Sequence, residues 1–351
     1  MKISRQILSF FFLVMMIQQE SHAAPPSPLY GVTIDNISNI DAVVASLANL
    51  PVKPTARIVF DTDMPAEHYK DVAEKIHAVS YVMGEIQDSC AFAKYSVDQY
   101  RARTQDYLDT LSDYVDIWEI GNEVNGEWLG NIKDVRKKLI AAYRLAKKQK
   151  EPIALTLYYN EGCTDRPQHE MFAWAEKELP THMKENLDYV FISYYPDDCP
   201  NTDPDWQQVF TRLHKLFPHA KIGFGEAGTA YDSEKADKIK STYSQRITVP
   251  NYVGGYFWWY FVQDMVPHTK ELWAVLADAM TAQKQALMIP GEESYPAIAN
   301  VMKDTLWNLS KSYRPFRFRT AHTAEDSAKV ARMKVNHCTS GAIPTTETPP
   351  H

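Results

Sequence analysis

The sequence predicts an α/β protein built as a single barrel of eight parallel strands, each followed by a helix. Short apolar runs alternate with amphipathic helical stretches over about 250 residues, and there are eight of each. That number and that length are typical of a (β/α)8, or TIM, barrel. The runs are continuously apolar, as strands covered on both faces are.

The chain order of these segments supports the barrel over an open sheet. The expected strands are residues 29–34, 56–60, 80–84, 115–120, 153–158, 189–194, 221–225 and 253–259. The expected helices are residues 41–50, 66–78, 97–111, 132–148, 168–179, 205–217, 233–245 and 269–280. A doubly wound sheet is the alternative, but it needs a glycine-rich phosphate loop after the first strand, and YGVTIDNIS is no such loop.

The first 23 residues are typical of a secretory signal peptide. Lys2 and Arg5 make its start positive, residues 8–17 are an apolar core too short to span a bilayer, and small residues precede a cleavage point after Ala23. An uncleaved anchor is the alternative, which the short core and the proline-rich APPSP disfavour. We therefore expect an exported protein, secreted or periplasmic, without a membrane segment after cleavage.

The rest of the chain divides into a barrel and a tail. We expect the barrel in residues 24–285, a helical extension in residues 286–338 with a helix at 295–310, and a disordered Thr- and Pro-rich end in residues 339–351. The formal net charge of −7 offers no basic face for nucleic acid. No His and carboxylate cluster has metal-ligand spacing, so we expect no metal or other cofactor, and we expect a monomer.

The candidate site lies where two strands end in glutamate. The stretch DIWEIGNEVNGEWLG, residues 116–130, begins as a buried strand, breaks at Gly121 and continues with Asn122 and Glu123. The seventh strand, KIGFGE, ends with Glu226. Functional residues of a TIM barrel lie at the carboxyl ends of its strands. Strands four and seven face each other across the mouth, so both carboxylates can approach one bound group.

These motifs resemble clan A of the retaining glycoside hydrolases. IGNEVNG is similar to that clan's Asn-Glu pair on strand four, and GFGEAG is similar in position to its strand-seven motif. The resemblance implies that Glu123 is the acid/base and Glu226 the nucleophile. It further implies that Trp258, in the pair Trp258-Trp259, floors the sugar site, and that Tyr194 in ISYYP donates a hydrogen bond to the nucleophile.

The chemistry of glycoside cleavage agrees with this assignment. The reaction needs a proton for the leaving oxygen and negative charge opposite the oxocarbenium ion that develops. Two carboxyls can do both if their environments differ. We expect Tyr194 and Arg57 to keep Glu226 ionised, the charge of Glu226 to keep Glu123 protonated, and Asn122 to bind the sugar 2-hydroxyl.

Other side chains near the strand ends have two interpretations. Arg57 precedes IVF on a buried strand, which favours an inward, paired side chain over a surface charge. Trp258 and Trp259 alternate across their strand, and we assign Trp258 to the site. Tyr195 faces opposite to its neighbour and is expected to pack. Trp128, in the loop after strand four, is either a sugar platform or a loop plug.

The cysteines predict one disulfide. Cys163 and Cys199 each lie four residues past a tyrosine, in the loops after strands five and six. Adjacent parallel strands run about 4.8 Å apart, so these cysteines can reach the separation of a disulfide. Cys90 and Cys338 are left over and could pair with each other.

The sequence therefore predicts an exported retaining β-glycoside hydrolase that acts on a poly- or oligosaccharide by double displacement. A non-catalytic carbohydrate-binding barrel is the alternative, although the presence of both Glu123 and Glu226 argues against it. An unrelated barrel enzyme would need a metal cluster or a phosphate loop after strands seven and eight, which EAGTAYDSE does not offer.

Overall fold

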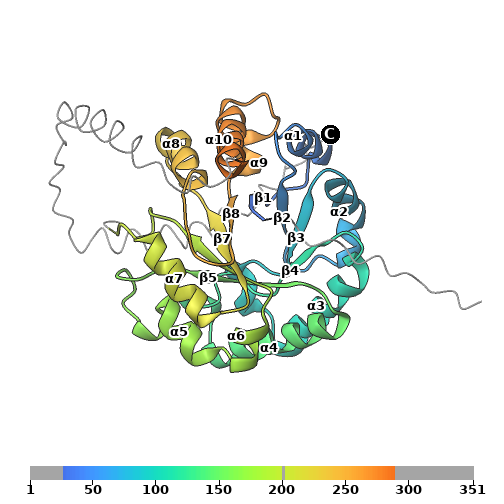
Figure 1. Ribbon diagram of the computed structural model, residues 1–351. Helices are drawn as coiled ribbons and strands as arrows, with labels where there is room; N and C mark the ends of the chain where they lie inside the picture. The colour runs from blue at the N-terminus through green and yellow to red at the C-terminus, as the bar shows by residue number, and fades with distance from the viewer. Residues whose placement is uncertain (1–26, 200–201, 289–351) are drawn as a thin grey trace, which may run out of the picture.

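The expected barrel is confirmed. The computed structural model describes residues 27–199 and 202–288, and its eight strands form one closed sheet in the order β1 to β8, parallel throughout. Figure 1 shows the strands at the centre with the helices around them, and β1 beside β8 where the barrel closes. The strands are β1 Leu29–Ile34, β2 Thr55–Val59, β3 Tyr81–Glu85, β4 Ile117–Glu119, β5 Ile153–Tyr158, β6 Tyr189–Tyr194, β7 Lys221–Ala227 and β8 Tyr252–Trp258.

The helices lie close to their expected positions. They are α1 Ile40–Ala48, α2 Lys70–His77, α3 Val97–Leu111, α4 Ile132–Gln149, α5 Met171–Glu178, α6 Thr181–Asn186, α7 Trp206–Leu216, α8 Asp232–Tyr243, α9 Phe261–Met265 and α10 Glu271–Met288. Short 3-10 helices are η1 Ala66–Tyr69, η2 Ser89–Lys94, η3 Glu127–Leu129 and η4 Pro167–His169. The short helices α6 and α9 were not expected from the sequence.

Side-chain capping explains where several helices begin. Ser96 precedes α3 and forms a capping box with Gln99, in which each side chain bonds the other residue's backbone N–H. The Asn131 side chain caps α4 by accepting from Lys133 N, and the Asp205 side chain caps α7 by accepting from Gln208 N. None of the helices within residues 27–199 and 202–288 is long and apolar enough to cross a bilayer.

The inside of the barrel divides into an apolar half and a polar half. Near the amino ends of the strands, the interior is filled by side chains that include Leu29, Ile117, Tyr189 and Val253. The larger apolar core lies between the outer faces of the strands and the helices. The inward positions further along the strands carry polar groups, described below. The apolar half therefore forms a floor beneath the mouth.

The expected disulfide between Cys163 and Cys199 is present, with a Cα–Cα separation of 5.5 Å across 36 residues of sequence. It joins the loop after β5 to the loop after β6. Cys90 is also disulfide-bonded. Cys338, the signal peptide, the helix expected at 295–310 and the C-terminal end lie outside the described residues.

Candidate active site

Glu123 and Glu226 converge at the carboxyl ends of the strands. Glu123 follows β4 and is 6% exposed, and Glu226 lies on β7 and is 4% exposed. The side chain of Asn122, the residue before Glu123, donates from Nδ2 to Glu226 Oε2 at 3.3 Å. This bond spans the mouth and brings the end of β4 to the end of β7.

A register shift directs Glu226 into the barrel. Along β7, Ile222 and Phe224 belong to the outer core, so strict alternation would turn residue 226 outward as well. The pairing of β6 with β7 shifts by one residue between Ile192 and Ser193, so that Ser193 pairs with Glu226. A bulge of this kind changes the direction of the side chains that follow it.

The backbone of Glu123 is held in an unusual conformation. Its φ is +49°, in the left-handed region that non-glycine residues occupy at a cost of about 1 kcal/mol or more. The Glu123 carbonyl accepts from Gly126 N at 2.7 Å, and Val124 N donates to Thr156 O at 3.2 Å. The tight turn after β4 therefore fixes the direction of the Glu123 side chain.

Arg57 on β2 is a fully buried cation that faces three carboxyls, so the expectation of an inward, paired arginine is confirmed. Its Nη1 lies 2.9 Å from Glu226 Oε2, and its Nε lies 2.7 Å from Glu119 Oε2 on β4. Its Nη2 lies 3.0 Å from Glu85 Oε2, on β3. The Thr156 hydroxyl donates to the other oxygen of Glu119. We call Arg57, Glu85 and Glu119 the buried charge cluster.

Burial raises the pKa values of two carboxyls that face Arg57, Glu85 and Glu226. It raises the pKa of Glu85 well above its usual range, although Arg57 opposes the shift. Burial raises the pKa of Glu226 to about 8, and the charge of Glu123 adds to the effect, while Arg57 and Tyr195 oppose it. Burial therefore disfavours the ionised form of both carboxyls, and the guanidinium of Arg57 offsets part of that effect.

The expected role of Tyr194 is wrong, and its neighbour takes it. The Tyr195 hydroxyl donates to Glu226 Oε1 at 2.7 Å. The Tyr194 ring instead packs on the outer side of the barrel, 4.8 Å from the Trp206 ring centroid. Residues of a strand alternate between its faces, and Phe191 on the same strand points inward. That alternation places Tyr195 inside and Tyr194 outside.

The expected role of Trp258 is wrong for the same reason. Trp258 is fully buried in the outer core, where its Nε1 donates to Asp264 Oδ2 at 3.1 Å. The partly exposed Trp259 ring faces inward, with the Arg57 guanidinium carbon 5.8 Å from its centroid. Phe257, two residues earlier, is also inside the barrel. Trp259 is therefore the strand-eight aromatic of the mouth.

Glu123 is held by two serine hydroxyls. Ser89, at the start of η2, donates to Glu123 Oε2 at 2.9 Å, and Ser193 on β6 donates to Oε1 at 2.7 Å. Trp128, in η3, donates from Nε1 to Ser89 Oγ at 3.0 Å and is partly exposed. Its ring lies edge-on to Tyr158, at 5.4 Å between centroids. Trp128 thus borders Glu123 rather than lying apart from it.

Sequence reasoning did not assign several of these groups to the site. They are Ser89, Glu119, Ser193, Tyr195 and Trp259. Glu119, the first glutamate of WEIGNE, could have indicated a buried ion pair, because a carboxylate within a buried strand needs a cation. The serines carried no signal, since small hydroxyl side chains are common throughout buried strands and turns.

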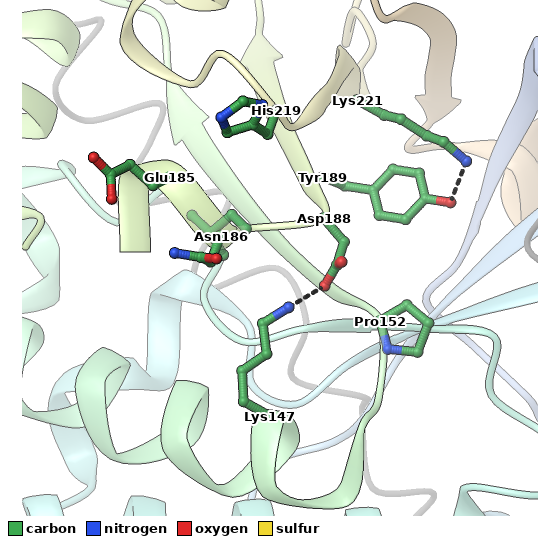
Figure 2. A pocket seen from close by; sticks show the side chains of 9 residues that line it. Lys147, Pro152, Glu185, Asn186, Asp188, Tyr189, His219 and Lys221 are labelled. Atoms are coloured by element: carbon green, nitrogen blue, oxygen red, sulfur yellow. Dashed lines mark hydrogen bonds and ion pairs between the residues drawn. The ribbon is translucent and has the colours of Figure 1, made fainter. Parts of the chain in front are cut away.

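Other parts of the structure do not add to the site. Within residues 27–199 and 202–288, no three or more His, Cys, Asp or Glu side chains are grouped so as to hold a metal ion. Figure 2 shows a depression lined by Lys147, Pro152, Asp188, Tyr189 and Lys221, among others. It contains the Lys147–Asp188 ion pair at 2.8 Å and lies at the amino ends of β5, β6 and β7. In barrels of this class, that end serves stability rather than chemistry.

Comparison with known proteins adds support for the fold. No protein-family model matches the chain, and no curated protein sequence matches it. Among solved structures, Saccharomyces cerevisiae Gas2 matches with a TM-score of 0.50 and 15% identity, over 77% of this chain and 69% of that chain. At this identity the similarity supports the barrel alone.

Two further solved structures match with lower scores. A GH128 endo-β-1,3-glucanase from Amycolatopsis mediterranei has a TM-score of 0.48 and 11% identity, over 72% of this chain and 99% of that chain. A GH1 β-glucosidase from Exiguobacterium antarcticum has a TM-score of 0.47 and 14% identity, over 70% and 86%.

Proposed function

We propose that the protein is an exported retaining β-glycoside hydrolase that cleaves an oligo- or polysaccharide by double displacement. In this proposal Glu226 is the nucleophile, and Glu123 is the general acid and then the general base. The observation that carries the proposal is the difference between their partners. Glu226 accepts from the donors of Arg57, Tyr195 and Asn122, whereas Glu123 contacts serine hydroxyls.

The partners of Glu226 suit a nucleophile. The guanidinium of Arg57 and the amide nitrogen of Asn122 can only donate, so they favour the carboxylate over the neutral acid. Burial opposes ionisation and raises the pKa of Glu226 to about 8. The reaction starts from the form in which Glu226 is ionised, which these donors favour. The ionised Glu226 attacks the anomeric carbon and forms a covalent glycosyl-enzyme.

The partners of Glu123 suit an acid that later acts as a base. A hydroxyl can donate to a carboxylate or accept from a carboxylic acid, so the two serines tolerate both forms of Glu123. In the first step Glu123 gives its proton to the glycosidic oxygen as the leaving group departs. In the second step it takes a proton from a water, which attacks the anomeric carbon and releases Glu226 as a carboxylate.

Groups around the pair can bind the sugar. Asn122 Oδ1 is buried and has no hydrogen-bond partner in the described part of the chain, so it is available to a sugar hydroxyl. The rings of Trp259 and Trp128 are partly exposed, the first beside Arg57 and the second beside Ser89. Sugar rings present apolar C–H faces that pack on such aromatic surfaces.

Hydrolysis of a panel of aryl β-glycosides and oligosaccharides tests the proposal. Laminari-oligosaccharides belong in the panel because Gas2 binds them. Proton NMR should show a product that first forms as the β-anomer. Glu226→Ala should lose turnover, and azide should partly restore it with an α-glycosyl azide as product. Glu185→Ala, at the opposite end of the barrel, is the control.

Three results would contradict this proposal. Sugar binding without hydrolysis would make the protein a carbohydrate-binding barrel. An α-anomeric first product would indicate inversion, with Glu226 as a base. Full activity of Glu226→Ala would show that Glu226 is not the nucleophile.

Export is part of the proposal. Residues 1–23 have the composition of a signal peptide, and the Cys163–Cys199 disulfide is suited to an oxidising compartment. Amino-terminal sequencing of the exported protein should begin at Ala24. A protein that retains its first 23 residues would contradict this part.

A further inference from the structure

We infer that Ser89 and Ser193 are positioning residues for the acid/base, and that Trp128 orients the Ser89 hydroxyl so that the catalytic proton of Glu123 resides on Oε1. The inference rests on the proposed role of Glu123, and it assigns functions to three side chains that do not themselves react.

Both oxygens of Glu123 are held at once. Ser89 Oγ donates to Oε2 at 2.9 Å, and Ser193 Oγ donates to Oε1 at 2.7 Å. Ser89 is 2% exposed and Ser193 is fully buried. Two hydrogen bonds from rigid, buried serines fix the plane of the carboxyl group. An acid that must deliver its proton to one bound oxygen needs its orientation fixed in this way.

Trp128 favours one orientation of the Ser89 hydroxyl. An indole N–H only donates, so the bond of 3.0 Å from Trp128 Nε1 occupies one of the two lone pairs of Ser89 Oγ. The Ser89 hydroxyl donates to Glu123 Oε2 on its other side. While Oε2 accepts this bond, the acidic hydrogen of protonated Glu123 lies on Oε1. Ser193 faces that oxygen and can accept from it until the glycosidic oxygen takes its place.

The strand β6 connects the two halves of the site. Ser193 holds Glu123 Oε1, and Tyr195, two residues later on the same face, holds Glu226 Oε1. Inward neighbours on a strand are about 6.6 Å apart along the chain. One strand therefore positions the acid and the nucleophile relative to each other, which makes Ser193 more than a passive neighbour of Glu123.

The inference predicts a dependence on the leaving group. Loss of proton donation matters for a poor leaving group, such as phenoxide or a sugar, and little for 2,4-dinitrophenolate. We expect Ser89→Ala and Ser193→Ala to lower kcat/KM for the phenyl glycoside by about 10- to 100-fold, the loss that a hydrogen bond to a charged group represents. For the 2,4-dinitrophenyl glycoside the change should stay within about threefold.

The phenyl and 2,4-dinitrophenyl glycosides carry the sugar that the protein cleaves fastest in the panel of aryl β-glycosides and oligosaccharides described above. Ser89→Thr, which keeps the hydroxyl, should restore most of the lost rate. Trp128→Phe, which keeps a ring but removes the N–H, should show the same dependence as Ser89→Ala, and it carries the test if Ser89→Ala does not fold. Ser80→Ala is the matched control, because Ser80 is equally buried but donates to Ile76 O away from the site.

The outcomes separate this inference from the proposed function. If Glu123→Ala shows the leaving-group dependence and the serine variants lose rate equally on both substrates, the serines are structural and the inference is overturned. If Glu123→Ala itself shows no dependence, then the assignment of the acid fails first. If Trp128→Phe behaves like the wild type while Ser89→Ala does not, the orienting role of Trp128 is refuted.

Discussion

Replacing Glu226 by glutamine should stabilise the protein at alkaline pH while it abolishes turnover. Glu226 is almost fully buried, and burial is the largest of the effects that raise its pKa to about 8. Glutamine has nearly the same shape and cannot ionise; its amide oxygen can accept from Arg57 and Asn122, and its amide nitrogen can donate to the Tyr195 hydroxyl oxygen. The native state of the variant therefore no longer has to hold a buried anion above pH 8.

The pKa of Glu226 gives the sign and size of the effect. Between the usual value of 4.5 and about 8, the native protein keeps a proton that the unfolded chain has released. Unfolding in that window releases a proton, so the stability of the wild type falls as pH rises through it. The window spans about 3.5 pH units, and at about 1.4 kcal/mol per unit this amounts to on the order of 5 kcal/mol.

Denaturant titrations at pH 5 and pH 9, with the disulfides intact, would measure this difference. At pH 5 the wild type and Glu226→Gln should have similar free energies of unfolding. At pH 9 the variant should be more stable by several kcal/mol. Glu185→Gln, which changes an exposed carboxylate, is the control. A variant that is less stable at pH 9 would refute the reasoning, because the ion pair with Arg57 would then outweigh the cost of burial.

Four further outcomes follow from the site. Arg57→Met should destabilise the protein by about 3–5 kcal/mol in denaturant titrations, since it leaves Glu119 buried and unpaired; a loss below about 1 kcal/mol would contradict this. Tyr195→Phe should lower kcat/KM by about 10- to 100-fold, whereas Tyr194→Phe should change it little, and the reverse order would refute the assignment. A pH–rate profile should rise towards about pH 8, as Glu226 loses its proton and becomes the nucleophile; a rate that stays constant from pH 5 to pH 9 would contradict that role. Cys163→Ser should lower the free energy of unfolding by up to about 4 kcal/mol, from the loop of 36 residues that the disulfide closes, and a change near zero would show that the loops are held by other contacts.

The sequence predicted the barrel and its two glutamates for physical reasons. The strands of a parallel barrel are buried on both faces, so they appear as separate apolar runs whose number can be counted. A polar group at the end of such a run must lie at the mouth, because the strand has left the core there. Glu123 and Glu226 were recognisable in this way, and so was the disulfide between Cys163 and Cys199, which follow neighbouring strands.

The sequence could not predict which strand residues point into the barrel and which point towards the helices, because the strands are buried on both faces. In ISYYP, either tyrosine finds an apolar environment, whether inside the barrel or under the helices, so no alternation of polar and apolar residues fixes the direction. The structure shows Tyr195 inside and Tyr194 outside. For the same reason Trp258 was predicted to face the site, whereas the structure shows Trp259 there and Trp258 in the outer core. The register shift that turns Glu226 inward depends on pairing between strands, which no single run encodes.

The apolar half and the polar half of the barrel interior have different roles. The apolar half, with Ile117 and Phe191, contributes burial and keeps water from the floor of the mouth. Above it, Arg57 faces Glu119 and Glu226 in surroundings of low polarity, where charges act on one another more strongly than in water. That setting raises the pKa of Glu226 and costs stability at alkaline pH. The apolar floor is therefore as necessary to the proposed chemistry as the carboxyls, because water admitted from below would screen the charges that set their protonation.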